Sequence, residues 1–306
     1  MKEEHLLLLS DLKKLIKQVV LIDYTIIILG GNLMSTEQAI HTKGLCKSFG
    51  KNEVLRKCSL TVEKGTIYGF LGINGAGKTT SLECIEGLKK YDSGTIIVKG
   101  KMGIQLQSSS LPAHIKPMEA IKLFAKWNTA KIDYSMLHTL GIKEIEKKQY
   151  AQLSTGQKRR LHLALALISN PDIIFLDEPT AGLDVEGRLL LHEQIHKLKS
   201  QGKTIVLASH DMAEVETLCD RIAILNHGNI VFCGTTSELT DKIGKKYFIH
   251  IKTLRGDSTF ETDNIEDTLI SLLGELKQKE IHVLDIKVDR GTLEQHFMEM
   301  TRREAE

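Results

Sequence analysis

A glycine-rich stretch, residues 72–79 with the sequence Gly-Ile-Asn-Gly-Ala-Gly-Lys-Thr, constrains the fold of this chain more than any other feature. It fits the pattern G-x-x-x-x-G-K-[ST]. It follows an apolar, β-prone run at 66–71 and precedes a segment in which Leu82, Ile85 and Leu88 recur at helical spacing. In such a strand–loop–helix turn, backbone N–H groups close around phosphate oxygens and the helix N-terminus adds positive potential. The sequence therefore predicts a phosphate-binding loop in an α/β fold, in preference to a glycine-rich turn without a ligand.

The polar side chains of this loop have distinct expected roles. Lys78 is expected to reach the β- and γ-phosphate oxygens, the Thr79 hydroxyl to bind Mg²⁺, and the Thr80 hydroxyl to meet an inner phosphate. ATP and Mg²⁺ are therefore the expected cofactors. The other residues predicted to contact the nucleotide within this loop are Gly72, Asn74, Gly75, Ala76 and Gly77.

A second acidic motif supplies the carboxylates that this chemistry needs. Residues 173–176 form a continuous apolar run, as a fully buried parallel strand does, and Asp177 follows at the C-terminal end. Ligands of open α/β sheets gather at that edge, so Asp177 is predicted to be a second Mg²⁺ ligand. Glu178 comes next and is predicted to polarise the water that attacks the γ-phosphate.

A third stretch, residues 152–168, opens with a Ser-Thr-Gly turn and continues as an amphipathic helix. The turn places hydrogen-bond donors at a helix start that has no obvious ligand in its own neighbourhood. Together with the phosphate loop and the acidic motif, this stretch resembles the nucleotide-binding subunit of an ATP-binding cassette (ABC) transporter. The resemblance runs from about Glu37 to Gly234 and continues more loosely to the C-terminus.

The resemblance assigns further motifs. Leu153–Gln157, Leu-Ser-Thr-Gly-Gln, looks like the signature loop, with Thr155 in place of the usual first glycine. If that position needed a positive φ, threonine would fit it poorly. The other matches are Phe49 as the aromatic that stacks on adenine, Gln107 as the Q-loop glutamine with Gln105 as the competing candidate, Asp184 as the end of the D-loop, and His210 as the switch histidine.

What the resemblance implies is a head-to-tail dimer of cassettes. Ser154, the Gly156 amide and Gln157 would then approach the nucleotide held by the phosphate loop of a second copy. The implied metal ligands are Thr79, Gln107 and Asp177. The implied catalytic residues are Lys78, Gln107, Glu178 and His210.

The chain is expected to contain three parts: an N-terminal extension at 1–33, an ATP-binding domain at 34–238 and a small α+β unit at 246–306. Within the ATP-binding domain, residues 112–170 are expected to form a helical subdomain on a β-rich core. The extension is expected to be disordered or untranslated, with a start at Met34. The competing interpretation is an amphipathic helix on a membrane surface.

The segment after Gln107, residues 108–127, is a candidate docking site for a membrane partner. It carries apolar residues beside a motif that senses the γ-phosphate. The alternative is that these residues build the core of the helical subdomain. The apolar residues are Leu111, Ile115, Met118, Phe124 and Trp127.

Composition narrows the class of function. The formal charge of +2, from 41 Lys and Arg against 39 Asp and Glu, provides no strong field for nucleic acid. The basic run Lys158–Arg160 is interpreted as a solvated helix face. Five cysteines without a C-x-x-C pair fit a reducing cytoplasm. No run reaches the roughly 18 uninterrupted apolar residues of a membrane span.

What the resemblance implies is the ATP-hydrolysing subunit of an exporter for drug-, lipid- or peptide-like substrates, with integral membrane permease subunits encoded separately. It is expected in the cytoplasm, held at the inner face of the cell membrane by the permease. The alternative is a soluble ABC ATPase that acts on ribosomes or DNA. That class normally needs a second cassette, a basic linker or long coiled coils, which this chain lacks.

Overall fold

The computed structural model describes residues 37–105, 111–243 and 247–290. The chain divides into two compact units, one that ends at Cys233 and one that starts at Gly234. Among the described residues, no helix has the length and apolar character that crossing a membrane requires.

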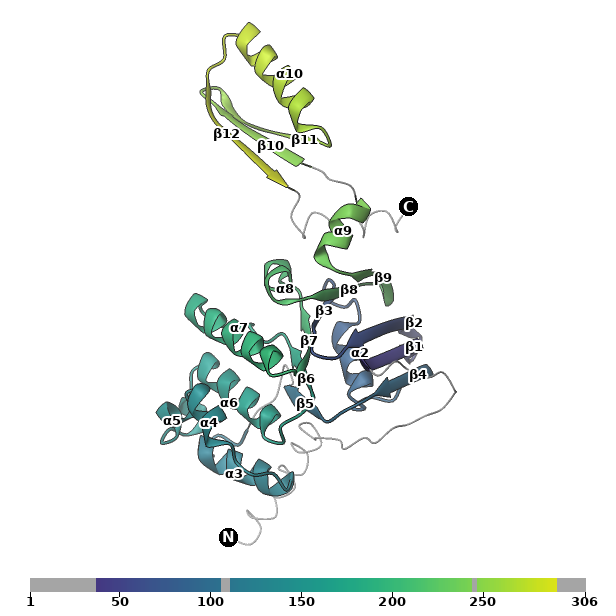
Figure 1. The fold of residues 1–306 in the computed structure, drawn as a ribbon, viewed down its shortest axis with the longest axis vertical. Helices are drawn as coiled ribbons and strands as arrows, with labels where there is room; N and C mark the ends of the chain where they lie inside the picture. Colours follow the sequence, from purple (N-terminus) through teal and green to yellow (C-terminus); the bar gives the residue numbers. More distant parts are fainter. Residues whose placement is uncertain (1–36, 106–110, 244–246, 291–306) are drawn as a thin grey trace. The chain divides into compact units, whose positions relative to one another are not determined.

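A six-stranded sheet forms the centre of the first unit, in the order β5-β6-β7-β3-β8-β9 (Figure 1). Its pairs β5–β6, β6–β7, β7–β3 and β3–β8 are parallel. Every residue of β3, β6 and β7 is buried, which explains why their sequences are continuous apolar runs rather than alternating ones. The strands are β3 (Ile67–Leu71), β5 (Met102–Gln105), β6 (Ile173–Asp177), β7 (Thr204–Ser209), β8 (Arg221–Asn226) and β9 (Asn229–Gly234).

A second sheet, of order β2-β1-β4, is antiparallel. Its strands are β1 (Gln38–Phe49), β2 (Asn52–Glu63) and β4 (Ser93–Val98). The helix α2 (Lys78–Ile85), which follows the phosphate loop, shares one apolar core with both sheets. Tyr68, Phe70 and Phe175 are the largest fully buried side chains of this core. This core holds the phosphate loop and the end of β6 on a common rigid support.

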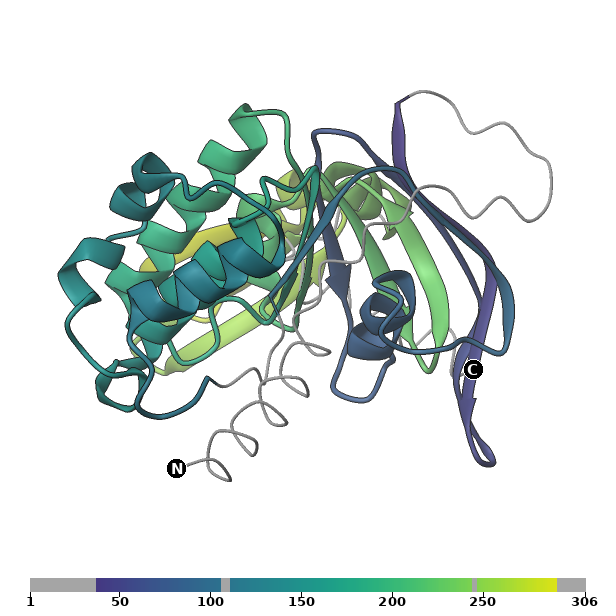
Figure 2. The ribbon, with the colours of Figure 1, turned by 90° about the horizontal axis from the view of Figure 1, so that it is seen from below.

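The helical part follows β5, as the sequence predicts. It contains α3 (Pro117–Trp127), α4 (Tyr134–Thr139), α5 (Ile142–Ile145), the 3₁₀ turn η1 (Tyr150–Gln152) and α6 (Thr155–Leu167), which lie together at one end of the unit in both views (Figures 1 and 2). The helix α7 (Val185–Ser200) follows β6, and α8 (Met212–Leu218) follows β7. Side chains cap four of these helices, where their oxygens accept hydrogen bonds from first-turn N–H groups: Asp133 on α4, Ser154 on α6, Asp184 on α7 and Asp211 on α8.

The second unit contains α9 (Thr236–Ile243), β10 (Tyr247–Thr253), β11 (Gly256–Thr262), α10 (Ile265–Gln278) and β12 (Val283–Arg290). Its antiparallel sheet has the order β11-β10-β12. The described residues of this unit therefore combine strands with helices, as an α+β unit does. The end of the predicted unit, from 291 onwards, lies outside the described residues.

Candidate functional site

The phosphate loop links β3 to α2, and its glycines fit where a side chain would not. Gly77 has φ +108 and Gly75 has φ +83, in the left-handed region that favours glycine. A Cβ on Gly72 would lie 2.7 Å from the Leu225 carbonyl oxygen, and one on Gly77 would lie 2.9 Å from the Leu55 side chain. Gly77 also precedes α2 without any side-chain cap. The N-terminal amides of α2 are therefore left to a ligand.

Lys78 folds back over this loop. Its ammonium donates to the carbonyl oxygens of Gly72 at 2.6 Å and Ile73 at 3.4 Å. Burial lowers the pKa of Lys78, and the nearby carboxylates of Glu178 and Asp177 partly oppose this shift. These two hydrogen bonds hold the positively charged ammonium group of Lys78 inside the phosphate loop.

Thr79 and Asp177 meet across the sheet edge. The Thr79 hydroxyl donates to Asp177 Oδ2 at 3.1 Å. The other oxygen, Oδ1, is buried and has no hydrogen-bond partner in the described part of the chain. Burial raises the pKa of Asp177, while the hydrogen bond from Thr79 acts in the opposite direction. A hydroxyl beside a carboxylate with a free oxygen is a donor set that suits Mg²⁺.

Glu178 and His210 form the second pair at this edge. Glu178 Oε2 lies 2.8 Å from His210 Nδ1, and the glutamate is buried while the histidine side chain is exposed. Glu178 has φ +48, and its N–H donates to the Ala208 carbonyl of the neighbouring strand. A non-glycine residue in the left-handed region costs about 1–3 kcal/mol and persists where surrounding bonds fix it. The left-handed backbone conformation of Glu178 therefore helps to set the direction of its carboxylate, which meets His210.

Three comparisons with known proteins bear on this geometry. The family model described as "ABC transporter" matches residues 55–181. An uncharacterised ABC transporter ATP-binding protein of Methanocaldococcus jannaschii is 35% identical over 268 residues, which cover 85% of this chain and 98% of that protein.

The chain belongs to the ABC transporter ATP-binding proteins.

Two further relatives of this cassette carry names that refer to export or resistance. The linearmycin resistance ATP-binding protein LnrL of Bacillus subtilis is 28% identical and covers 86% of this chain and 98% of its own length. The Nod factor export ATP-binding protein I of Sinorhizobium fredii is 35% identical and covers 68% of this chain and 66% of its own length.

Solved structures show the same fold. A structure of the ATP-binding subunit of an ABC transporter has a TM-score of 0.61 at 23% identity, covering 67% of this chain and 92% of its own. The ADP conformation of another cassette has a TM-score of 0.59 at 24% identity, covering 66% and 93%. The predicted P-loop cassette fold is therefore confirmed.

The predicted signature loop, Leu153–Gln157, lies at the start of α6. Ser154 Oγ accepts from the Gln157 N–H at 3.3 Å, and Gln157 Oε1 accepts from the Ser154 N–H at 3.2 Å, which together form a capping box. Thr155 is the first residue of the helix and does not have a positive φ, so threonine fits there. A Cβ on Gly156 would make only ordinary contact, at 3.5 Å, with Leu183. No described residue requires glycine at position 156.

The remaining predicted nucleotide contacts are at the surface. Phe49, at the end of β1, is 47% exposed, and the ammonium groups of Lys47 and Lys89 lie 5.2 and 5.3 Å from its ring centre. Its open ring could stack on a base. Asp184 caps α7 through a 2.8 Å hydrogen bond from the Gly187 N–H. Thr80 is half-buried in the first turn of α2.

The two candidates for the Q-loop glutamine are Gln107 and Gln105. Gln107 lies outside the described residues. Gln105 ends β5, is 2% exposed, and neither its Oε1 nor its Nε2 has a hydrogen-bond partner in the described part of the chain. Because buried amides are normally hydrogen-bonded, the side chain of Gln105 is a candidate to bind water or a ligand at the end of β5.

A cation near the carboxylates was not predicted from the sequence. The basic run Lys158–Arg160 is predicted to be a solvated helix face, and this prediction does not hold for Arg159. Arg159 is half-buried, and its charge interacts with Asp177 and Glu178. Lys158 lies 5.1 Å from the ring centre of Tyr150, and Arg160 pairs with Glu144 at 3.4 Å. A run of basic residues carries no signal of which member faces inward, because that depends on the packing of α6.

The proposed docking segment has mixed burial. Leu111 and Phe124 are buried, and Ile115 and Met118 are half-buried. Trp127 is 50% exposed. The core interpretation therefore accounts for the first two residues, while Trp127 is the member that remains open to a partner.

Proposed function

We propose that this chain hydrolyses ATP with Mg²⁺ and thereby energises a membrane permease. The observation that carries the proposal is the convergence, at one sheet edge, of the phosphate loop, the Thr79–Asp177 pair and the Glu178–His210 pair. A phosphate-binding cradle, a cation-binding carboxylate and an oriented acid–base pair are the parts that phosphoryl transfer to water needs.

Thr79 and Asp177 fit a Mg²⁺ ion, because Asp177 Oδ1 is buried without a partner among the described residues. Gln107 would be a further ligand. When bound, Mg²⁺ would neutralise charge on the nucleotide phosphates. Lys78 would exchange its carbonyl partners for phosphate oxygens, and its buried position would strengthen that charge-assisted bond.

Glu178 would accept the proton of the attacking water or orient that water. His210 would hold the glutamate through the 2.8 Å contact at Nδ1. Positioning by a second side chain is the pattern expected of a general base, whose loss typically costs 10²–10⁴-fold in rate.

The nucleotide would lie between two copies of the cassette. Ser154 and Gly156 are at the N-terminus of the 13-residue helix α6, which favours an anion. The packing of the described residues does not require glycine at position 156, and a close approach by a group from a second copy would account for its small size. A γ-phosphate held by a second copy would be that group.

Export is the favoured direction of transport, because relatives include a Nod factor export protein and a linearmycin resistance protein. The chain would act at the inner face of the cell membrane through separate permease subunits. Purification of the tagged chain from its native membranes tests this. Permease subunits are expected with it; ribosomes or DNA in their place would favour the soluble alternative.

Glu178→Gln tests the catalytic assignment. The variant should retain ATP binding and lose turnover by at least about a hundredfold, because an amide cannot accept the proton. Glu216→Gln on α8, at an exposed position, is the matched control for the change of charge. Turnover by Glu178→Gln equal to that of the control would remove Glu178 from the mechanism.

A further inference from the structure

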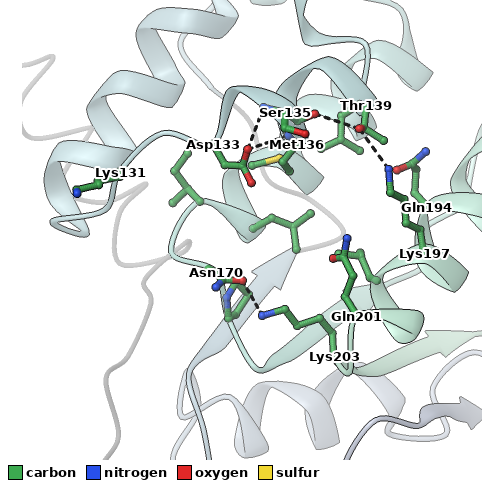
Figure 3. Close-up of a pocket in the computed structure, with 15 residues that line it drawn as sticks. Lys131, Asp133, Ser135, Met136, Thr139, Asn170, Gln194, Lys197, Gln201 and Lys203 are labelled. Carbon is green, nitrogen blue, oxygen red and sulfur yellow. Dashed lines mark hydrogen bonds between the residues drawn. The ribbon is translucent and has the colours of Figure 1, made fainter.

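A cavity of about 340 Å³ lies between α4, the turn from α6 into β6, and the C-terminal end of α7 (Figure 3). None of its lining residues belongs to the phosphate loop, the acidic motif or the signature loop. Its volume falls at the lower end of the range for small-molecule sites, which is about 300–1,000 Å³. The cavity is therefore large enough for a compact ligand and separate from the nucleotide residues.

The floor of the cavity is apolar. Leu140, Leu167 and Ile168 are buried beneath it, and Met136 and Leu198 are half-buried at its sides. These residues come from α4, α6 and α7, so the floor is formed only when the helical part packs against the core. Such a floor favours the apolar body of a ligand.

The walls of the cavity carry positive charge with neutral partners. Lys203 Nζ donates to Asn170 Oδ1 at 2.6 Å, and Lys197 Nζ donates to Thr139 Oγ1 at 3.4 Å (Figure 3). Among the described residues, neither ammonium forms a salt bridge. Lys131 adds a third positive charge at the margin of the cavity.

Asp133 is the only carboxylate in this lining. One of its oxygens already accepts hydrogen bonds from the N–H groups of Ser135 and Met136, at 2.9 and 3.1 Å, where it caps α4. The carboxylate therefore serves the helix and leaves an excess of positive charge in the lining. An anion would exchange the neutral acceptors of the lysines for charged ones, which form stronger hydrogen bonds.

We propose that this cavity binds a small amphipathic anion. A carboxylate or phosphate group would be held by Lys197 and Lys203, with an aryl or short alkyl body on Met136, Leu140 and Leu198. A ligand in this position contacts both the helical part, through α4, and the core, through α7. It therefore stabilises the arrangement of these two parts that the structure shows, by its binding free energy.

Phenyl phosphate is a suitable probe, with benzoate as the carboxylate arm and benzyl alcohol as the neutral one. Binding is followed in the full chain by NMR of ¹³C-methyl methionine, with the Met136 signal assigned through Met136→Leu. Phenyl phosphate or benzoate should shift the Met136 signal saturably, whereas benzyl alcohol should not. Which of the two anions binds shows whether the cavity prefers a phosphate or a carboxylate. Excess ADP should leave the shift unchanged, because the phosphate loop lies elsewhere.

The matched variants remove equal charge inside and outside the cavity. The double variant Lys197→Gln with Lys203→Gln should weaken binding about tenfold or more, whereas Lys143→Gln with Lys147→Gln, at exposed positions outside the lining, should not. Gln201→Trp keeps both lysines but fills the space, and should abolish binding.

Three results would overturn the proposal. They are the absence of a saturable Met136 shift with either anion, equal affinity for benzyl alcohol, and equal affinity in the two double variants.

Discussion

A few ionisable side chains of the cassette are buried, and they differ in the partners that stabilise their charge. Glu178 has His210 as its partner and Lys78 has two carbonyl groups. Glu86, at the end of α2, is 2% exposed, and its Oε2 has no hydrogen-bond partner among the described residues. Burial, with Asp177 and Glu83 nearby, raises the pKa of Glu86 to about 8.

The sign of the resulting pH dependence follows from linkage. Between the unfolded value of about 4.5 and about 8, the folded chain binds the Glu86 proton more tightly than the unfolded chain does. This contribution to the free energy of unfolding is fully present below pH 4.5 and is lost as the pH rises to 8. The loss is on the order of 5 kcal/mol, at about 1.4 kcal/mol for each pKa unit.

Glu86→Gln should therefore be more stable relative to the parent at pH 8.5 than at pH 5.5, because the amide stays neutral at both. Urea unfolding at the two pH values measures the difference. Glu193→Gln, at an exposed position on α7, is the control and should show no such change. A Glu86→Gln difference that is the same at both pH values would show that the carboxyl ionises normally.

At the scale of elements, helix ends decide where functional groups lie. Ser154 and Asp184 cap α6 and α7 in the ATP-binding unit, so the same side chains that begin these helices also lie at the predicted nucleotide surface. In the C-terminal unit, Asn264 caps α10 by accepting from the Asp267 N–H at 3.2 Å. A substitution at Asn264 can therefore change the stability of α10 without altering any predicted nucleotide-binding residue.

Asn264→Ala should destabilise the C-terminal unit by about 1 kcal/mol, since the first turn of α10 loses its side-chain acceptor. Thermal unfolding measures this effect, and ATP turnover per folded chain should stay unchanged. Ser271→Ala, at an exposed position inside α10, should not lower the stability, because alanine favours the helix more than serine does. A loss of turnover in Asn264→Ala alone would indicate that the C-terminal unit acts on the cassette.

At the scale of the whole molecule, one chain is proposed to supply two separate half-sites, the phosphate loop and the predicted signature loop. Gly156→Asp is a suitable probe of the second, because among the described residues a Cβ there meets only Leu183, and an acid in the first turn favours the helix. The same negative charge would repel a γ-phosphate brought by a second copy.

Gly156→Asp and Lys78→Ala should each have low ATP turnover alone and regain part of the parent turnover when mixed. The mixed dimer contains one complete site, with Lys78 from one chain and Gly156 from the other. The two variants are assayed separately and together at constant total protein. Turnover in the mixture equal to the mean of the separate values would exclude a shared site.

The sequence by itself determined the local elements and their motifs. The loop at 72–79, the buried strand before Asp177 and the cap at Ser154 are each encoded within a few neighbouring residues. Backbone sterics, strand burial and helix capping act over that range, so pattern alone predicts them. The parallel sheet then follows, because its strands are linked through helices.

Only the tertiary structure decided which charges are buried and where a cavity remains. The position of Arg159 near Asp177 and Glu178, the burial of the Glu86 carboxyl and the lysine-lined cavity between α4 and α7 depend on residues far apart in the sequence. Desolvation and packing are properties of the space around a side chain, and distant segments build that space only when the chain has folded.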